Sequence, residues 1–287
     1  MNITRVVQPR RLRLIIAAVV VAVAGVLIPL SQTASAHTVG SSEPKPSIVL
    51  VHGAWADSGA WDGVIRKLQA DRYTVYALPN PLRGLATDAA YLADFLHSIS
   101  GPIVLVGHSY GGAVITNAAT GDSQVKALVY VDAFAPDQGQ TLAQLLTAYP
   151  GSCAVPTNLN VVPFPGAPSG VGDAYIKQSA FPSCMANDLP AAGARVLAAT
   201  QRPIATSALA EPTGVPAWKT IPSWSVVGTI DNAIPLTLQL AMDNTAHAHV
   251  TEVRASHLSR PLCVKGFGAA VVKSAAMRNS VPGWFGL

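Results

Sequence analysis

The sequence predicts an α/β fold in which a mostly parallel sheet of about six strands is flanked by helices, with a cap inserted after the fourth strand. Two observations lead to this prediction. Apolar, β-branched runs that suit strands buried on both faces alternate with amphipathic helical patterns along most of the chain. The alternation stops for about 85 residues after Asp132 and resumes near Ser223. Alternating strands and helices imply a parallel sheet, and the interruption implies an insertion within one domain.

The expected elements follow one another in chain order. Strands are predicted for residues 47–51, 73–77, 103–106, 125–131, 223–227 and 249–254. Apolar residues recur every three or four positions between these strands. This periodicity predicts helices at 61–68, 86–97, 111–119, 236–241 and 265–276.

The insertion, at about residues 135–215, is rich in Pro, Gly and Ala and has short helical patterns at 142–148 and 191–199. We therefore expect a small and mainly helical cap. Gly, Ser and Pro cluster at 37–46, which indicates a flexible lead-in. Residues 47–287 are long enough to form one domain with its own core.

The first 36 residues have the organisation of a secretory signal peptide. Four arginines precede an uncharged apolar run at 14–30, and small residues follow at 34–36. A retained membrane anchor is the alternative, because a run of 17 residues is at the lower limit for crossing a bilayer. The small residues favour cleavage, so we expect a secreted or extracytoplasmic protein, periplasmic in a Gram-negative source. The arginine pair at 10–11 leaves Sec and twin-arginine export both open.

The charge balance changes once the signal is removed. The full sequence has 19 Lys and Arg against 15 Asp and Glu, and residues 1–36 contain four of the basic residues and none of the acidic ones. The remaining chain therefore balances 15 basic residues against 15 acidic ones. A nucleic-acid-binding protein would carry a basic patch, so we expect no nucleic-acid partner. After signal cleavage we expect no membrane partner either.

The chain has three cysteines, Cys153, Cys184 and Cys263. In an oxidising compartment Cys153 and Cys184 could form a disulfide that closes a loop of about 30 residues and contributes about 3–4 kcal/mol. Three buried thiols are the alternative.

The segment Gly107-His108-Ser109-Tyr110-Gly111 directly follows the third predicted strand and precedes a helix of small residues. Its glycines permit a sharp strand-to-helix turn that strains the serine backbone and exposes the serine Oγ. A serine hydroxyl becomes a nucleophile when a base accepts its proton and the developing oxyanion is bound. This context favours Ser109 as a nucleophile over a purely structural glycine turn.

A base and an acid are expected downstream of Ser109. His257 follows the last predicted strand, and loops at the carboxyl ends of parallel strands meet at one crevice, so we expect His257 to be the base. Asp231 follows the strand after the cap and gives the chain order Ser, Asp, His. Asp132, at the end of the fourth strand, is the alternative acid, or it caps a turn.

Two backbone amides are expected to bind the oxyanion. One belongs to Tyr110, the residue after the nucleophile. The other is expected from Ala54 in the loop after the first strand, because Gly53 lets that loop approach the substrate closely. His52, in the same loop, is either a second base or a brace for the loop.

These motifs resemble those of the α/β-hydrolase superfamily. The resemblance is carried by Trp61, by Ser256-His257 and by the segments 51–55, 104–112 and 227–231, and it covers most of residues 47–275. The sequence is similar in particular to the branch that contains small bacterial esterase-like hydrolases, plant methylesterases and hydroxynitrile lyases. This resemblance implies that the protein needs no cofactor and no metal.

Two departures from the lyases of that branch imply hydrolysis. Those lyases have a threonine at the position of Gly53 and a lysine at the position of Leu258. We therefore expect an exported serine hydrolase, a carboxylesterase that acts through an acyl-enzyme intermediate on Ser109. The same triad could instead perform perhydrolysis, lactone opening or C–C cleavage, or the pocket could bind a ligand without turnover.

The composition of the cap indicates a small-molecule substrate that is mainly apolar. The cap contains few charged residues, and a cap over the crevice helps to choose the substrate. Six aromatic residues in or beside it either form its core or line the pocket: Phe134, Tyr149, Phe164, Tyr175, Phe181 and Trp218.

Overall fold

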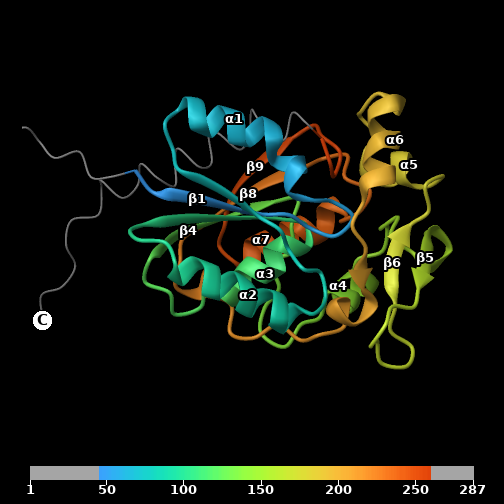
Figure 1. Ribbon diagram of the computed structural model, residues 1–287, viewed down its shortest axis with the longest axis horizontal. Coiled ribbons are helices and arrows are strands. Elements are labelled where there is room, and N and C mark those ends of the chain that lie inside the picture. Colours follow the sequence, from blue (N-terminus) through green and yellow to red (C-terminus); the bar gives the residue numbers. More distant parts are fainter. Residues whose placement is uncertain (1–44, 260–287) are drawn as a thin grey trace, which may run out of the picture. The chain divides into compact units, whose positions relative to one another are not determined.

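The protein folds around a sheet of six parallel strands, which confirms the predicted fold class. The computed structural model describes residues 45–259 (Figure 1). The strand order is β2-β1-β3-β4-β8-β9, and every neighbouring pair is parallel. The strands are β1 (Ser47–Val51), β2 (Val75–Leu78), β3 (Ile103–His108), β4 (Val125–Val131), β8 (Ser223–Gly228) and β9 (His249–Val253).

Helices cover both faces of this sheet because successive strand residues point to opposite sides. Ile48 and Leu50 of β1 belong to the apolar layer under α1 (Asp62–Ala70). Val49 and Val51 belong to the apolar layer on the opposite face, which contains buried residues of three further helices. These helices are α2 (Leu85–His97), α3 (Tyr110–Ala118) and α7 (Leu236–Thr245). Figure 1 shows α1 on one side of the sheet and α2 and α3 on the other.

The elements differ from the predicted bounds by a few residues. The largest consequence is at β3, which continues through Gly107 and His108 because both residues remain paired with β4. Since α3 begins at Tyr110, Ser109 stands alone between a strand and a helix. The signal peptide, most of the lead-in, Cys263 and the helix predicted at 265–276 lie outside the described residues. Within residues 45–259, no helix combines the length and the apolar character needed to cross a membrane.

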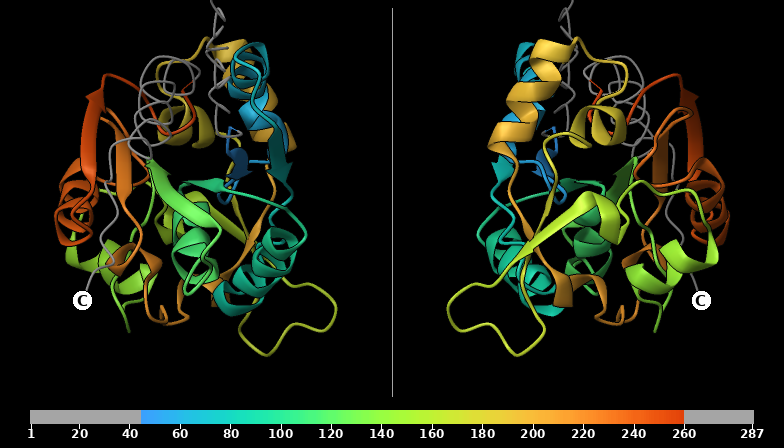
Figure 2. Two further views of the ribbon diagram at one scale, coloured as in Figure 1. Left: turned by 90° about the vertical axis from the view of Figure 1, so that its left-hand side faces the viewer. Right: turned by 90° about the vertical axis from the view of Figure 1, so that its right-hand side faces the viewer.

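The cap between β4 and β8 is more elaborate than the sequence predicts. Its helices are α4 (Leu142–Ala148), α5 (Phe181–Met185) and α6 (Ala191–Thr200), and the first and last occur where they are predicted. The cap also contains an antiparallel sheet, in the order β5-β6-β7, which the sequence did not indicate. Its strands are β5 (Leu159–Val162), β6 (Asp173–Ile176) and β7 (Ile204–Ala205). Figures 1 and 2 show α5, α6, β5 and β6 gathered at one end of the main sheet.

Candidate active site

Ser109 occupies a strained turn at the carboxyl end of the central strand β3. Its backbone has φ 55° and ψ −125°, a conformation that non-glycine residues rarely adopt. The turn is tight, since a Cβ on Gly107 would lie 2.5 Å from the carbonyl oxygen of Gly111. The Ser109 carbonyl accepts hydrogen bonds from the amides of Gly112 (2.9 Å) and Phe134 (3.1 Å). The residue is therefore held firmly, and it is only 3% exposed.

The loop after β1 lies directly against Ser109. A Cβ on Gly53 would lie 2.4 Å from the Cβ of Ser109 and 3.0 Å from its Oγ, so only glycine fits this approach. Ala54 and Tyr110, the residues predicted to donate amides to an oxyanion, are both buried. The structure thus places the two expected donor segments on either side of the candidate nucleophile.

His52 braces this loop. The amide of Asn80 donates to His52 Nε2 (2.9 Å), so Nδ1 carries the proton and donates to the carbonyl of Gly53 (2.9 Å). Burial lowers the pKa of the His52 ring, which keeps it neutral. Both ring nitrogens are occupied by backbone groups, so neither is available for proton transfer.

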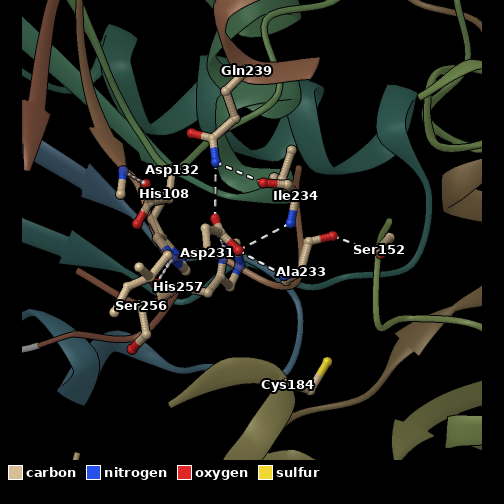
Figure 3. A network of polar contacts seen from close by, with 12 residues as sticks. His108, Asp132, Ser152, Cys184, Asp231, Ala233, Ile234, Gln239, Ser256 and His257 are labelled. Carbon is tan, nitrogen blue, oxygen red and sulfur yellow. Dashed lines mark hydrogen bonds and ion pairs between the residues drawn. The ribbon is translucent and has the colours of Figure 1, made fainter. Parts of the chain in front are cut away.

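Asp231 and His257 form a buried pair, with 2.8 Å between the aspartate Oδ2 and the histidine Nδ1 (Figure 3). Three other donors fix the same carboxylate: the amides of Ala233 (2.7 Å) and Ile234 (3.0 Å) to Oδ1, and Gln239 Nε2 (2.9 Å) to Oδ2. An ionised carboxylate accepts only, so His257 Nδ1 is the donor and Nε2 carries the lone pair. Nε2 is buried and has no hydrogen-bond partner among residues 45–259.

The structure brings Asp231 and His257 into direct contact and places Ser109 on the turn next to them, without a hydrogen bond between Ser109 Oγ and His257 Nε2. The link to that turn runs through His108, the neighbour of Ser109. His108 Nε2 bonds the carbonyl oxygen of His257 (2.9 Å), and the two ring centroids are 4.7 Å apart. Burial, followed by the charge of His257, holds the pKa of His108 well below its usual value, so this ring is a neutral donor.

His108 and Gln239 are contacts that the sequence analysis missed. His108 lies inside the Gly107–Gly111 motif, and its position next to Ser109 is the sequence feature that could have identified it as a site residue. Gln239 had no signal, because its contact with Asp231 depends on how α7 packs.

Asp132, the alternative acid, lies beside the pair but does not make the contact. One side-chain oxygen of Asp132, one of Asp231 and one ring nitrogen of His257 all lie within 4.8 Å of one another. Asp132 Oδ1 accepts the amide of Gly228 (2.5 Å), while Oδ2 has no partner among the described residues. Burial, followed by the charge of Asp231, raises the pKa of Asp132 well above its usual value. Of the two neighbouring carboxyl groups, only that of Asp231 contacts His257.

A cavity of about 320 Å³ adjoins His257. Apolar side chains of the cap and of the histidine loop contribute to its wall, namely Leu189, Leu197 and Leu258. The cavity wall also includes His52 and His108, the residues next to Gly53 and Ser109.

A disulfide joins Cys153 to Cys184 within the cap. Cys153 follows α4, and Cys184 belongs to α5. Figure 3 shows Cys184 close to the network around Asp231 and His257.

Known proteins identify this architecture. A profile of the Alpha/beta hydrolase family matches residues 48–262, and the chain therefore belongs to the alpha/beta hydrolase family. It is 33% identical over 113 residues to a carbendazim hydrolyzing esterase from Nocardioides sp. (strain SG-4G). That match covers 35% of this chain and 47% of the relative, so the chain spans about half the length of that relative.

Solved structures show the same fold. A pyrethroid hydrolase from Sphingobium faniae JZ-2 superimposes with a TM-score of 0.67 at 20% identity, over 82% of this chain and 99% of the other. A methylesterase from Arabidopsis gives a TM-score of 0.66 at 16% identity, over 79% and 99% of the two chains. Both belong to the range of esterase-like α/β hydrolases that the sequence motifs resemble.

Proposed function

We propose that this protein is an exported serine hydrolase that cleaves carboxylic esters through an acyl-enzyme intermediate. The observation that carries the proposal is the buried hydrogen bond of 2.8 Å between Asp231 and His257. This bond fixes the histidine tautomer in which Nε2 bears the lone pair. The turn that presents Ser109 is anchored to the same histidine through His108.

In the proposed reaction Ser109 Oγ attacks the ester carbonyl while His257 Nε2 accepts the serine proton. Asp231 stabilises the imidazolium, and the amides of Ala54 and Tyr110 bind the oxyanion. His257 then protonates the leaving alcohol and activates the water that releases the acid from Ser109. The mechanism requires Ser109 Oγ and His257 Nε2 to come within hydrogen-bond distance when the substrate is bound.

The substrate we propose is a small, uncharged and mainly apolar ester. The leucines of the cavity wall beside His257 support this choice. The names of the relatives suggest a panel: a pyrethroid ester, carbendazim and simple methyl esters, with p-nitrophenyl acetate as the reference substrate.

The export proposal rests on the signal-like pattern of residues 1–36. The mass of the protein recovered outside the cytoplasm tests it. We expect a mature chain that begins at His37, whereas a full-length mass in the membrane fraction would contradict signal cleavage.

The central test is Ser109→Ala, for which we expect a loss of several orders of magnitude, roughly 10⁴–10⁶-fold, in kcat. Ser223→Ala is the matched control, because Ser223 is buried to the same 3% and lies away from the site. A fluorophosphonate probe should label the wild-type protein and the control but not Ser109→Ala. Wild-type turnover by Ser109→Ala would overturn the proposed function.

A further inference from the structure

Two segments of the cap hold the loops that carry Asp231 and His257. We call these segments, residues 152–153 and 183–188, the cap clamp. The Cys153–Cys184 disulfide joins them across a sequence separation of 31 residues. In each contact described below, the cap clamp binds a residue that is one or two positions away from Asp231 or His257 in the sequence.

The first set of contacts reaches the acid loop. Asp231 sits in the loop after β8, and residues on both of its sides bond the cap clamp. Four hydrogen bonds make this contact: Cys153 N to Asn232 O (2.7 Å), Ser152 Oγ to Ala233 O (2.6 Å), Asn232 Nδ2 to Ser183 O (2.9 Å) and Asn187 Nδ2 to Ile230 O (3.1 Å). Both halves of the clamp therefore bind the acid loop, and the disulfide ties those halves together.

The second set of contacts reaches the histidine loop. Asp188 accepts two hydrogen bonds from Ser256, from its hydroxyl to Oδ1 and from its amide to Oδ2 (3.2 Å). On the other side of His257, the amide of Leu258 donates to the carbonyl of Met185 (2.8 Å). The peptide on each side of His257 is thus held by the cap, while the ring itself is held by the core residue Asp231.

We propose that the cap clamp positions the Asp231–His257 pair, and that Asp188 is the positioning residue for His257. This inference rests on the proposed function, since it concerns the base of that reaction. Asp188 touches neither the substrate nor the reacting atoms and acts through Ser256. The cap therefore takes part in catalysis by fixing the base, in addition to covering the site.

The chemistry of Asp188 suits this role. Burial alone would raise the pKa of the carboxyl group, but hydrogen bonding by Ser256, Ser259 and the Asp188 backbone outweighs it, and the pKa lies below its usual value. The side chain is consequently a charged acceptor near neutral pH. Charged acceptors make shorter and stronger hydrogen bonds than neutral ones, which suits a contact that must restrain a loop. Ser256, the donor, is fully buried.

The experiment compares Asp188→Ala with Asp188→Asn in the full chain, produced where disulfides form. Three quantities are measured: kcat and KM on p-nitrophenyl acetate, the rate constant for labelling of Ser109 by a fluorophosphonate, and the Tm. We expect kcat and the labelling rate of Asp188→Ala to fall roughly tenfold to hundredfold, with KM within about twofold, because the base and not the substrate is displaced. Asp188→Asn should recover part of the loss, since its amide oxygen still accepts from Ser256.

Asp137→Ala is the control, because it removes another cap carboxylate that pairs with Lys219 and not with the histidine loop. It should retain wild-type kcat. The double variant Cys153→Ser, Cys184→Ser tests the clamp independently of Asp188 and should also lower kcat while the chain remains folded.

Wild-type kcat and labelling in Asp188→Ala would overturn the clamp and leave the proposed function intact. An equal loss in Asp137→Ala, or no recovery in Asp188→Asn at an unchanged Tm, would also overturn it. Failure of the wild-type protein itself to react with the fluorophosphonate would instead overturn the proposed function, and the clamp with it.

Discussion

The core and the cap of this protein are stabilised in different ways. All six residues of β3 are buried, and the strand pairs with a neighbour on each side. In β5 of the cap, three of the four residues are exposed, and the strand pairs with β6 alone. The cap shares the apolar core through residues such as Ile176, Phe181 and Met185, and it is also held by a disulfide and by polar contacts, such as the ion pair of 2.5 Å between Arg83 and Asp173.

This difference in stabilisation suits the core and the cap to different roles. The buried ladders of the core can hold a strained serine, because the surrounding structure compensates for its backbone energy. The additional polar contacts of the cap can instead position the loops that they reach, those of Asp231 and His257. The predictions below test the comparison with paired variants, beginning with the largest expected effect.

The two core carboxyl groups should respond very differently to the same substitution. Asp231→Asn should lower kcat/KM about 10³–10⁴-fold, because the amide no longer fixes the His257 tautomer or stabilises the imidazolium. Asp132→Asn should stay within about tenfold of the wild type, since Asp132 makes no hydrogen bond to His257 and an amide oxygen can still accept from Gly228. Hydrolysis of p-nitrophenyl acetate, with folding checked by circular dichroism, measures both. Full activity in Asp231→Asn alongside a large loss in Asp132→Asn would assign the acid to Asp132.

Glycines of the core and the cap should also differ. Gly53→Ala should lower kcat roughly 100-fold or more, because its Cβ would collide with Ser109 and displace the nucleophile. Gly193→Ala is the matched change in the cap, where a Cβ on helix α6 meets nothing within 4 Å. It should leave kcat unchanged and raise the free energy of unfolding by about 0.5–1 kcal/mol. Wild-type kcat in Gly53→Ala would show that the loop after β1 does not lie against Ser109 during the reaction.

The same contrast explains what the sequence could predict. Continuous apolar runs such as Ile103–Val106 identify core strands without any knowledge of their neighbours, because a strand that is buried on both faces is apolar at every position. The strands of the cap are two to four residues long, which is too short for an alternating pattern to separate them from loops, even in β6, where Ala174 and Ile176 are buried. Their pairing depends on contacts that are distant in sequence.

For the candidate site, chain order was informative and side-chain contacts were not. The position of Ser109, Asp231 and His257 after strands of one parallel sheet follows from the predicted topology. The choice between Asp231 and Asp132 needed the geometry, since both residues follow strands of the same sheet. The role of Asp188 could not be predicted, because a cap aspartate bonded to Ser256, 68 positions away, has no local signature.

Buried and exposed acids should give opposite dependences of stability on pH. Burial raises the pKa of Asp243 in α7 from 3.8 to about 7, with Ser225 partly offsetting the rise. The folded state therefore binds a proton that the unfolded state has released, so this stabilisation is complete below about pH 4 and is lost as the pH rises to about 7. The total is at most about 4 kcal/mol. Asp243→Asn should remove that dependence.

In the cap, a hydrogen bond from Lys219 lowers the pKa of the exposed Asp137, so its contribution is present at neutral pH and is lost on acidification. Because both side chains are exposed, Asp137→Asn should cost less than about 1 kcal/mol. The free energy of unfolding in urea is measured for each variant and for the wild type at pH 4.5 and pH 8. Subtracting the wild-type value removes the contribution of groups that both proteins share, such as Asp132. We expect Asp243→Asn to gain stability relative to the wild type between pH 4.5 and pH 8. Asp137→Asn should keep an almost constant difference over this range, because both pH values lie above 3.8, the ordinary pKa of the carboxyl group. An unchanged difference for Asp243→Asn would mean that its carboxyl group reaches water in the folded protein.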